Sequence, residues 1–391
     1  MYIHRVMAGE NFADIAANYR IPQSKLIENN GYMQNEQLTP GEELLVVVPT
    51  RTYTVKEGDT LFQIARRFNV KKSELIATNP DLCGGDKTYV GQILTVKCQR
   101  QNLGMTAANG YLSPSTPRKA LYRALPYLVY VTVAAAITDG ESIHCQKISF
   151  DAVGEVKKHG KIPLLRIYDG TGGAFLSSKA SREELPERVV EAAQQGGYSG
   201  VVFASPRAAS EFASEYADFI FETRKRMIGS ELIFFTECDE FAKAECVDLA
   251  DGNILVYSKI DVSAPKSFDE AEKNVLTRFA ECAESSKTFI DLLSHGFDGK
   301  RFIPFGKMNR IFRERDAEIT HDESTLLARI NTKKESIVYE TLENLKAKLE
   351  IVGELGFMGI NIDIENAPIN QLMLYHTMFT SVSYNPFYSG G

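Results

Sequence analysis

The sequence predicts a multidomain protein in which two small βααβ modules precede a (β/α)8 TIM barrel. One pattern of residues occurs twice near the start of the chain, and strand-like and helical segments alternate from there onward. The chain has 391 residues, which is more than one ordinary domain needs. We expect a first module at residues 1–49, a second at 50–98, a linker at 99–105 and the barrel at 106–391.

The repeat occupies residues 6–16 and 55–65, which match position by position. Within the second copy, Leu61, Ile64 and Ala65 place apolar side chains on one face of a short helix. Each copy therefore predicts a βααβ unit, which consists of a strand, a helix, a shorter helix and a closing strand.

Residues 53–61 read Tyr-Thr-Val-Lys-Glu-Gly-Asp-Thr-Leu and resemble the opening of a LysM module, as does the first copy. The resemblance implies binding of an N-acetylglucosamine-containing polymer, peptidoglycan or chitin, between the first loop and the loop before the last strand. Two modules side by side suit avidity for such a repetitive polymer. The alternative is that the loop residues serve only as turn and cap residues. The glycan-binding residues implied by the resemblance are Gly9, Glu10, Asn11, Phe12, Asn30, Gly58, Asp59, Thr60, Leu61, Asn79, Pro80, Asp81 and Leu82.

Eight barrel strands are expected after the linker. Each is a short run rich in β-branched, aromatic or other apolar residues. Helical segments lie between them, and residues 341–355 form the clearest, with Leu342, Leu345 and Leu349 on one face. The expected strands are residues 106–112, 127–137, 162–168, 200–205, 231–237, 253–259, 287–293 and 359–364.

The barrel region resembles glycoside hydrolase family 18 in residues 110–112, in the segment 127–139 and in residues 197–200. That family carries an acidic D-x-x-D-x-D-x-E signature on its fourth strand. When the two are aligned through Tyr198, no acidic residue remains at any of the four positions. The residues that stand there are Ser199, Val202, Ala204 and Pro206.

The family resemblance implies which catalytic groups this barrel lacks. In this family a glutamate at the position of Pro206 protonates the leaving oxygen, and an aspartate at the position of Ala204 holds the substrate's acetamido group. A spacing of two puts both side chains on the same face of the strand. Residues 201–207 contain no carboxylate, so no shift of the alignment restores the pair. Because losing general acid catalysis costs about 10²–10⁴-fold in rate, we expect a catalytically degenerate barrel.

A rival catalytic site lies at the last strand. Asp363 and Glu365 share one face of this strand, and Tyr257 keeps the tyrosine that the family has on its sixth strand, whereas Ser258 replaces the family's aspartate. Only 26 residues follow Glu365, so we expect this strand to be the eighth and not a displaced fourth. The alternatives for the pair are a solvated strand end, a new hydrolytic pair or cation site, and a retained sugar-binding floor. Acids expected at the ends of neighbouring strands are Asp169, Glu237 and Asp239.

The amino-acid composition limits the kinds of molecule that the protein is expected to bind. The net charge of −7, with both signs interspersed, argues against nucleic acid and anionic membranes as partners. No apolar run approaches the roughly 20 residues of a membrane span. Six cysteines without C-x-x-C spacing predict no metal site, no cofactor is expected, and pairing of Cys83 with Cys98 stays open. The chain contains no tryptophan, so sugar stacking would depend on Tyr and Phe.

The resemblance to spore-associated LysM proteins with family 18 barrels implies a place in the spore envelope or cell wall. The first residues show no signal peptide, so we expect synthesis in the cytoplasm. We expect a protein that binds peptidoglycan or a chitin-like polymer and carries a silent barrel, with spore-coat proteins as further partners. The alternatives are an active spore-cortex N-acetylglucosaminidase with a shifted acid, and a structural spore-coat protein.

Overall fold

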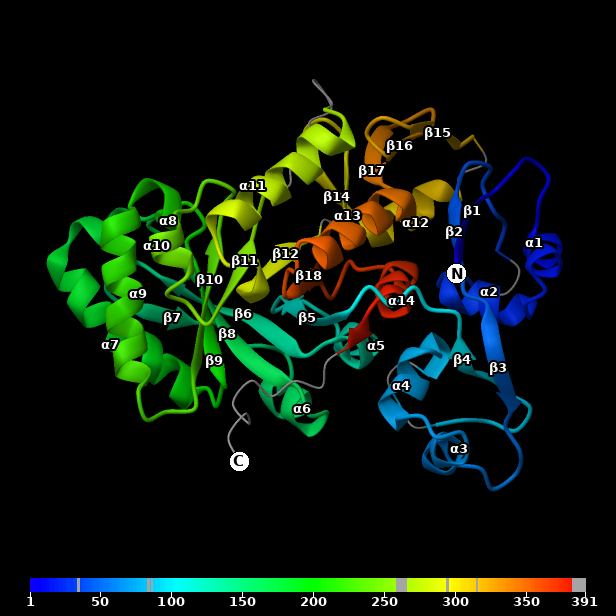
Figure 1. Cartoon of the computed structure of the whole chain (residues 1–391), viewed down its shortest axis with the longest axis horizontal. Helices are drawn as coiled ribbons and strands as arrows, with labels where there is room; N and C mark the ends of the chain where they lie inside the picture. Colours follow the sequence, from blue (N-terminus) through cyan, green and yellow to red (C-terminus); the bar gives the residue numbers. More distant parts are fainter. Residues whose placement is uncertain are drawn as a thin grey trace.

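The computed structural model describes residues 1–33, 36–82, 85, 87–257, 266–292, 295–313 and 316–381. The barrel forms one part of an elongated molecule, and the two modules lie together at the other end (Figure 1). The predicted fold class, two small modules followed by a TIM barrel, is confirmed. None of the helices in the described ranges combines the length and the apolar composition that a bilayer crossing requires.

The first module is a two-stranded sheet covered by two helices. Strands β1 (Tyr2–Arg5) and β2 (Glu43–Val46) pair antiparallel, and the helices are α1 (Phe12–Tyr19) and α2 (Gln23–Asn29). Asn11 begins α1, because its side-chain oxygen accepts hydrogen bonds from two backbone N–H groups of the first turn. Buried apolar side chains give the module a core of its own.

The second module repeats this arrangement, again with its own core. Its first helix begins with a capping box, in which Thr60 and Gln63 each bond the other's backbone N–H. Its elements are β3 (Pro49–Thr54), α3 (Leu61–Arg67), α4 (Lys72–Ala77), the 3-10 turn η1 (Pro80–Leu82) and β4 (Ile93–Cys98).

All eight predicted barrel strands are present and pair in parallel. The first of them pairs with both the second and the eighth, which closes the barrel. The second strand starts at Tyr130 instead of residue 127, because a 3-10 turn, η2 (Leu125–Tyr127), contains a proline and precedes it. The strands are β5 (Met105–Leu112), β6 (Tyr130–Thr138), β8 (Ile162–Asp169), β9 (Gly200–Ala204), β10 (Ile233–Cys238), β11 (Gly252–Leu255), β12 (Thr288–Asp291) and β18 (Gly359–Asp363).

Strands β11 and β12 are each three residues shorter than predicted. β11 ends at Leu255 and β12 at Asp291, whereas the sequence predicted strands as far as residues 259 and 293. Residues 258–265 and 293–294 lie outside the described residues.

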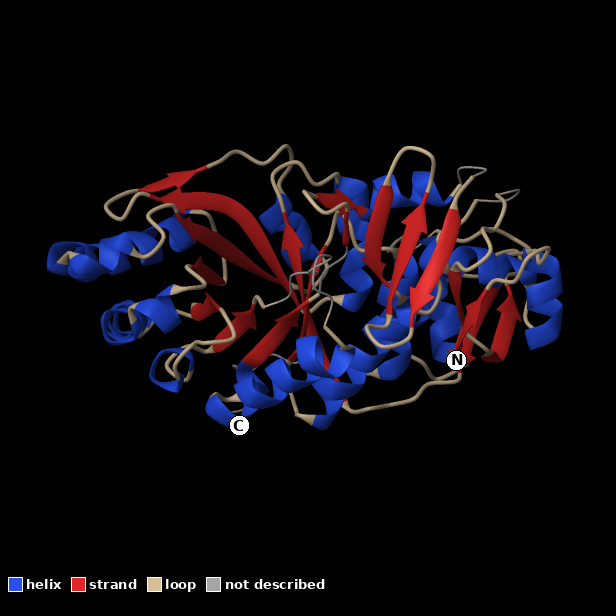
Figure 2. Cartoon of the chain, turned by 90° about the horizontal axis from the view of Figure 1, so that it is seen from above, coloured by secondary structure: helices blue, strands red, loops and turns tan. Residues whose placement is uncertain are grey.

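Helices lie outside the barrel strands on several sides (Figure 2), and the apolar side chains of the strands fall into an inner and an outer layer. Tyr130, Val202, Phe235 and Phe289 belong to the inner layer. The alternate residues of the same strands pack outward against the helices. The longer helices are α7 (Lys179–Gln195), α9 (Ala213–Met227), α11 (Asn274–Cys282), α13 (Leu342–Glu354) and α14 (Ile369–Met378), and the shorter ones are α5 (Arg118–Ala124), α6 (Ala152–Lys158), α8 (Ala208–Glu211) and α10 (Ala244–Val247).

A second sheet lies between β12 and α13, and the sequence analysis did not predict it. It has five antiparallel strands in the order β14-β13-β17-β16-β15, and a core of its own. We call it the inserted sheet. Its elements are β13 (His295–Phe297), β14 (Phe302–Pro304), α12 (Phe305–Phe312), β15 (Glu318–Asp322), β16 (Leu327–Asn331) and β17 (Ser336–Glu340).

Both modules pack against the barrel. Leu45, Val47 and Ala77 are buried in the outer apolar layer of the barrel. The Tyr127 hydroxyl donates a hydrogen bond to the Ala77 carbonyl oxygen at 2.9 Å. The linker is held as well, because the Leu103 backbone N–H bonds the carbonyl oxygen of Met378 at 2.7 Å.

Lys25 joins the two modules. Its side chain is only 1% exposed, and its Nζ donates to Glu28 Oε2 at 2.6 Å and to Asn79 Oδ1 of the second module at 3.2 Å. Asp81 Oδ1 lies 3.5 Å from the same Nζ. A buried cation is tolerated where carboxylates and an amide oxygen surround it, so this contact fixes how the modules meet.

Candidate functional site

The fourth strand, β9, ends in the barrel mouth with small or apolar side chains. Val202 packs in the inner layer, and Ala204, two residues further on, faces the same way and is fully buried. Pro206 follows the strand, and its carbonyl oxygen accepts a hydrogen bond from the Asp239 backbone N–H at 2.9 Å. Neither Ala204 nor Pro206 can transfer a proton.

An ion pair extends across this strand. Arg166 on β8 lies opposite Val202, and Glu237 on β10 lies opposite Ala204, in the parallel register of the three strands. The Arg166 Nε and Nη2 atoms donate to Glu237 Oε1 and Oε2 at 2.5 and 2.7 Å. The pair therefore occupies the space into which acids at positions 202 and 204 would project.

Aromatic rings hold the arginine in place. The Arg166 guanidinium lies 5.0 Å from the centre of the Tyr111 ring and 5.6 Å from that of Tyr168. Burial disfavours its charge, but the Glu237 carboxylate outweighs burial and raises the pKa of Arg166. The guanidinium thus stays charged and paired in the mouth.

Sequence reasoning missed Asp291, which ends β12 beside this pair. Asn361 donates from Nδ2 to Asp291 Oδ1 at 2.5 Å, and its own Oδ1 accepts from Asn109 Nδ2 at 2.7 Å. Burial raises the pKa of Asp291 to about 7, although the hydrogen bond from Asn361 opposes this. A polar residue that ends an apolar strand was the available signal.

The structure assigns Asp363 to a turn. Its Oδ1 accepts the Glu365 backbone N–H at 3.0 Å, and its Oδ2 accepts from Asn366 Nδ2 at 2.7 Å. His295 Nε2 lies 3.7 Å from the same Oδ2. Glu365 is exposed, and its Oε2 is 3.4 Å from the Ser113 hydroxyl. Asp363 therefore closes the end of β18, while Glu365 remains open to solvent.

Tyr257 is engaged elsewhere. Its hydroxyl donates to Glu272 Oε2 at 2.6 Å, and Glu272 in turn pairs with the buried Lys348 at 3.0 Å. Burial, the nearby Glu272 carboxylate and this hydrogen bond raise the pKa of the phenol. Ser258, the neighbour that replaces the family's aspartate, lies outside the described residues.

The other predicted acids of the mouth are also satisfied locally. Asp169 accepts hydrogen bonds from the Gly173 backbone N–H at 2.6 Å and the Ser205 hydroxyl at 2.7 Å. Asp239 accepts from the Ser210 hydroxyl at 2.8 Å. Within the described ranges, no group of three His, Cys, Asp or Glu side chains is arranged to hold a metal ion. Cys98 carries a free thiol, and Cys83 lies outside those ranges.

The first loop of each module is open. Gly9 and Gly58 adopt positive φ angles of 87° and 78°, and a Cβ at either position would meet nothing within 4 Å. Glu10 accepts the Met7 backbone N–H at 2.8 Å, and Asp59 accepts that of Lys56 at the same distance. These carboxylates shape the turns, and the glycines at their tips are exposed.

The remaining residues of these loops divide in the same way in both modules. Asn11 and Thr60 are exposed helix caps, whereas Phe12 and Leu61 are buried in the module cores. Phe12 packs edge-on against Tyr32 with ring centres 4.9 Å apart.

The second loops are enclosed, which the sequence did not predict. Asn30 bonds the Leu26 carbonyl oxygen and both backbone groups of Leu45, and Asn79 makes the matching three bonds in the second module. The side chains of Asn30 and Asn79 are therefore used inside the modules. Pro80 and Leu82 are buried, and Asp81 accepts from Gln92 Nε2 at 2.6 Å besides facing Lys25.

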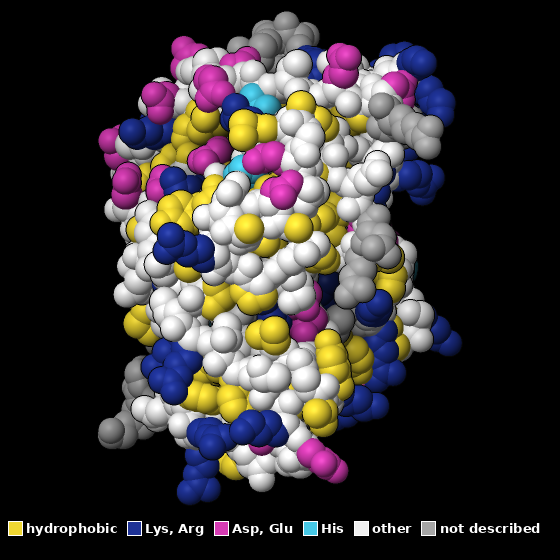
Figure 3. Space-filling view, turned by 90° about the vertical axis from the view of Figure 1, so that its right-hand side faces the viewer, with side chains coloured by type: hydrophobic (Ala, Val, Ile, Leu, Met, Phe, Trp, Pro, Cys, Tyr) yellow, Lys and Arg dark blue, Asp and Glu magenta, His cyan; other side chains and the backbone are white. Residues whose placement is uncertain are grey.

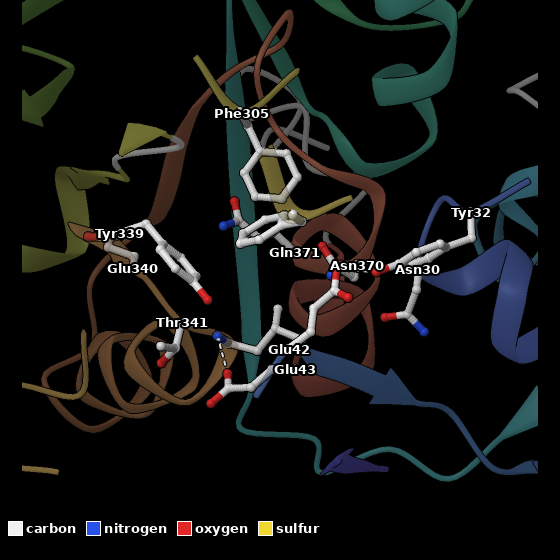
Figure 4. Close-up of a pocket in the computed structure, with 12 residues that line it drawn as sticks. Asn30, Tyr32, Glu42, Glu43, Phe305, Tyr339, Glu340, Thr341, Asn370 and Gln371 are labelled. Atoms are coloured by element: carbon white, nitrogen blue, oxygen red, sulfur yellow. Dashed lines mark hydrogen bonds between the residues drawn. The ribbon is translucent and has the colours of Figure 1, made fainter. Parts of the chain in front are cut away.

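The first module, the inserted sheet and α14 meet at a small cavity of about 40 Å³ (Figure 4). Glu43 reaches across this junction, and its Oε2 accepts the Leu342 and Glu343 backbone N–H groups at 2.7 and 3.2 Å. Burial raises the pKa of Glu43 to about 7, although these bonds to the start of α13 oppose it. The residues that line the cavity include Asn30, Tyr32, Glu42, Glu43, Tyr339 and Asn370.

The fold and the modules define a class of protein. Residues 4–47 and 53–97 match the LysM domain family. The barrel has the fold of chitinase-like glycoside hydrolases of family 18. The chain thus consists of two LysM domains followed by a barrel with the fold of family 18 chitinases.

Particular proteins share this whole arrangement. The spore cortex-lytic enzymes SleL of Bacillus cereus and Bacillus megaterium QM B1551 superpose with TM-scores of 0.73 and 0.74, each at 18% identity. The superpositions cover 97% and 98% of this chain and 99% of each SleL chain. A chitinase from Chromobacterium violaceum ATCC 12472 covers 70% of this chain, and 98% of its own, with a TM-score of 0.61 and 13% identity. These likenesses establish the fold.

In sequence, the chain is similar to YdhD of Bacillus subtilis (strain 168), a protein named as a sporulation-specific glycosylase. The two are 23% identical over 237 residues, which cover 58% of this chain and 56% of YdhD. The chain therefore spans about half the length of that curated relative.

Proposed function

We propose that the protein binds an N-acetylglucosamine-containing polymer of the spore envelope or cell wall through its LysM modules, and that its barrel does not hydrolyse this polymer. The observation that carries the second part is the ion pair of Arg166 and Glu237 above β9. The pair lies in register with positions 202 and 204, while Pro206 stands in place of the family's proton donor and Ala204 in place of its partner aspartate.

The binding role is supported by the open first loops. Gly9 and Gly58 leave backbone N–H and C=O groups facing solvent, where acetamido groups of a sugar could bond them. Asn11 and Thr60 stand beside them and are exposed. Two such loops on one chain favour a repetitive ligand, because the second contact forms at a high effective concentration.

A second candidate function is hydrolysis with a shifted acid. Glu365 is exposed at the end of β18, so a substrate could reach its carboxyl group. The residues that would assist it are less suitable, because Asp363 closes a turn and the Tyr257 hydroxyl already donates to Glu272. We therefore rank this candidate second, and a purely structural role in a spore coat third.

Assays of turnover and of sedimentation distinguish the three candidate functions. The full-length protein should release no product from a chromogenic chitobioside or from peptidoglycan fragments, alongside an active family 18 chitinase as positive control. It should sediment with insoluble peptidoglycan or chitin. Hydrolysis that Glu365→Gln abolishes, and that the exposed-site control Glu141→Gln retains, would establish the second candidate instead. A protein that neither cleaves nor sediments would support the structural role.

A further inference from the structure

We propose that the second module carries a cationic surface that makes the protein bind carboxylate-bearing glycan more tightly than neutral chitin. The surface consists of Arg51, Arg67 and Lys97 around the rings of Tyr53 and Phe68, and we call it the basic face. The inference rests on the proposed glycan-binding function and adds the chemical class of the glycan.

The two modules carry opposite charge although they share one fold. Residues 1–49 contain three Lys and Arg against six Asp and Glu, which gives −3, whereas residues 50–98 contain eight against five, which gives +3. Figure 3 shows Lys and Arg side chains gathered toward the lower end of this side of the molecule, where Figure 1 places the second module. Asp and Glu side chains gather in its upper half. The molecule as a whole is negative, so this positive region is local.

Two cations of the basic face oppose one another across the sheet. Arg51 on β3 is the register partner of Lys97 on β4, and both side chains are exposed. The ladder is irregular on either side of Arg51, and like charges that neighbour one another on adjacent strands repel. In the described part of the chain, neither cation has a carboxylate within ion-pair distance. An external anion would relieve this repulsion.

Aromatic rings hold two guanidinium groups in place. The Arg51 guanidinium lies 5.0 Å from the centre of the Phe68 ring, and that of Arg67 lies 5.7 Å from the centre of the Tyr53 ring. Arg67 also donates to the Tyr53 hydroxyl at 3.2 Å. The two rings are 5.4 Å apart at 62°. A guanidinium held over a ring keeps part of its N–H fork free, and this fork matches a carboxylate.

The first module provides an internal comparison. At the positions of Arg51, Arg67 and Lys97 it carries uncharged residues, whereas the ring of Phe68 is retained as Tyr19. The module folds in the same way without these charges, so the LysM fold does not require them. The residues at those three positions are Tyr2, Asn18 and Val47.

Among N-acetylglucosamine polymers, the basic face fits those that carry carboxylates. Peptidoglycan bears carboxylates on the peptides attached to its muramic acid residues, and on those muramic acid residues that carry no peptide, whereas chitin is uncharged. Each contact at an exposed site is worth little alone and is screened by salt. Three cations on a repetitive anionic polymer act together, so the preference should be measurable at low ionic strength.

The test uses the full-length protein and three soluble probes: peptidoglycan fragments, the same fragments with their carboxylates amidated, and a chito-oligosaccharide of similar length. Calorimetry at low salt should show binding about tenfold tighter for the unmodified fragments than for the amidated ones. The preference should vanish at high salt. Arg51→Gln combined with Arg67→Gln and Lys97→Gln should abolish it, and a charge-matched control with Lys157→Gln, Lys158→Gln and Lys179→Gln on α6 and α7 should retain it.

The outcomes separate the two proposals. Equal binding of unmodified and amidated fragments by the wild type would overturn the basic face, while binding of any probe sustains the proposed function. Binding of none of the probes would refute the proposed function itself. Equally tight binding of polyglutamate, a polyanion without sugar, would overturn the assignment to glycan. The effects of salt and of amidation are measured on the wild type. These two measurements therefore decide the test even if the triple variant does not fold.

Discussion

At the scale of residues, the barrel mouth holds two charges that neutralise each other. Arg166 and Glu237 come from the strands on either side of β9 and meet above Val202 and Ala204. Their side chains are 17% and 7% exposed, so the pair is largely removed from water. If one partner of such a pair is removed, the other charge remains buried without compensation, which destabilises the folded state.

Removing one partner should therefore cost more than removing both. Glu237→Gln should lower the free energy of unfolding by about 2–4 kcal/mol, because it leaves the Arg166 cation largely buried without its carboxylate. Arg166→Met combined with Glu237→Leu should stay within about 1–2 kcal/mol of the wild type. Urea denaturation of the three proteins measures both effects. A single variant as stable as the wild type would mean that water screens the pair.

Restoring the family's acids should not restore hydrolysis. In a variant with Ala204→Asp and Pro206→Glu, the Arg166 guanidinium lies beside the new aspartate and would hold it in an ion pair. The aspartate would then be unavailable to orient an acetamido group. We expect no release from a chromogenic chitobioside, with an active family 18 chitinase measured in parallel. Turnover near that of the chitinase would show that the two substitutions alone had silenced the barrel.

At the scale of elements, the modules use their most polar loop residues as internal braces. Asn30 connects the end of α2 to β2 through three hydrogen bonds, and Asn79 connects α4 to β4 in the same way. Each amide satisfies two carbonyl oxygens and one N–H group that would otherwise be buried without partners.

Asn30→Ala should accordingly act on stability. We expect a loss of about 2–4 kcal/mol, because three buried backbone groups lose their partner. Asn11→Ala, which removes an exposed helix cap, should cost about 1 kcal/mol. Thermal unfolding followed by circular dichroism measures both. If Asn30→Ala melted like the wild type and yet lost binding to peptidoglycan, the side chain would be a glycan contact after all.

The elements differ in how well their sequence predicts them. The modules and the eight strands follow from local periodicity, so residues 55–65 or 200–205 predict their own structure. The inserted sheet escaped because β13 and β14 have only three residues each, too few to show an alternation. The ion pair of Arg166 and Glu237 joins barrel strands three and five across the fourth strand, β9. The burial of Lys25 depends on the neighbouring module. Neither is encoded by spacing along the chain.

At the scale of the whole molecule, the parts share surfaces. Leu45 and Val47 of the first module and Ala77 of the second complete the outer layer of the barrel, and Glu43 caps α13 from outside. The module cores alone do not cover these side chains, so the full chain is the natural unit for binding experiments.

Stability should fall as the pH rises because of Glu43. Its folded-state pKa of about 7 lies above the ordinary value of 4.5, so the folded state holds a proton that the unfolded state releases. The contribution is fully favourable below pH 4.5 and is lost as the pH rises toward about 7. We expect the wild type to lose about 1–3 kcal/mol between pH 5 and pH 8 at this site. Glu43→Gln, which keeps an acceptor for α13, should reduce this loss.

Chemical denaturation at pH 5, 6, 7 and 8 measures the effect. Glu57→Gln, which changes an exposed glutamate in the second module, is the matched control and should leave the pH dependence unchanged. A Glu43→Gln variant with the same slope as the wild type would show that this carboxyl is not the group that titrates.

The cap that Glu43 places on α13 belongs to the contact through which force would pass between the modules and the barrel. If a flexible linker alone connected the modules to the barrel, it would extend under force and the barrel could rotate freely. Here a pulling force on a polymer bound to the modules would reach the barrel through two contacts. One joins β2 to α13, and the other joins the linker to the end of α14. The barrel should therefore keep one orientation relative to the modules while a polymer bound to them is stretched.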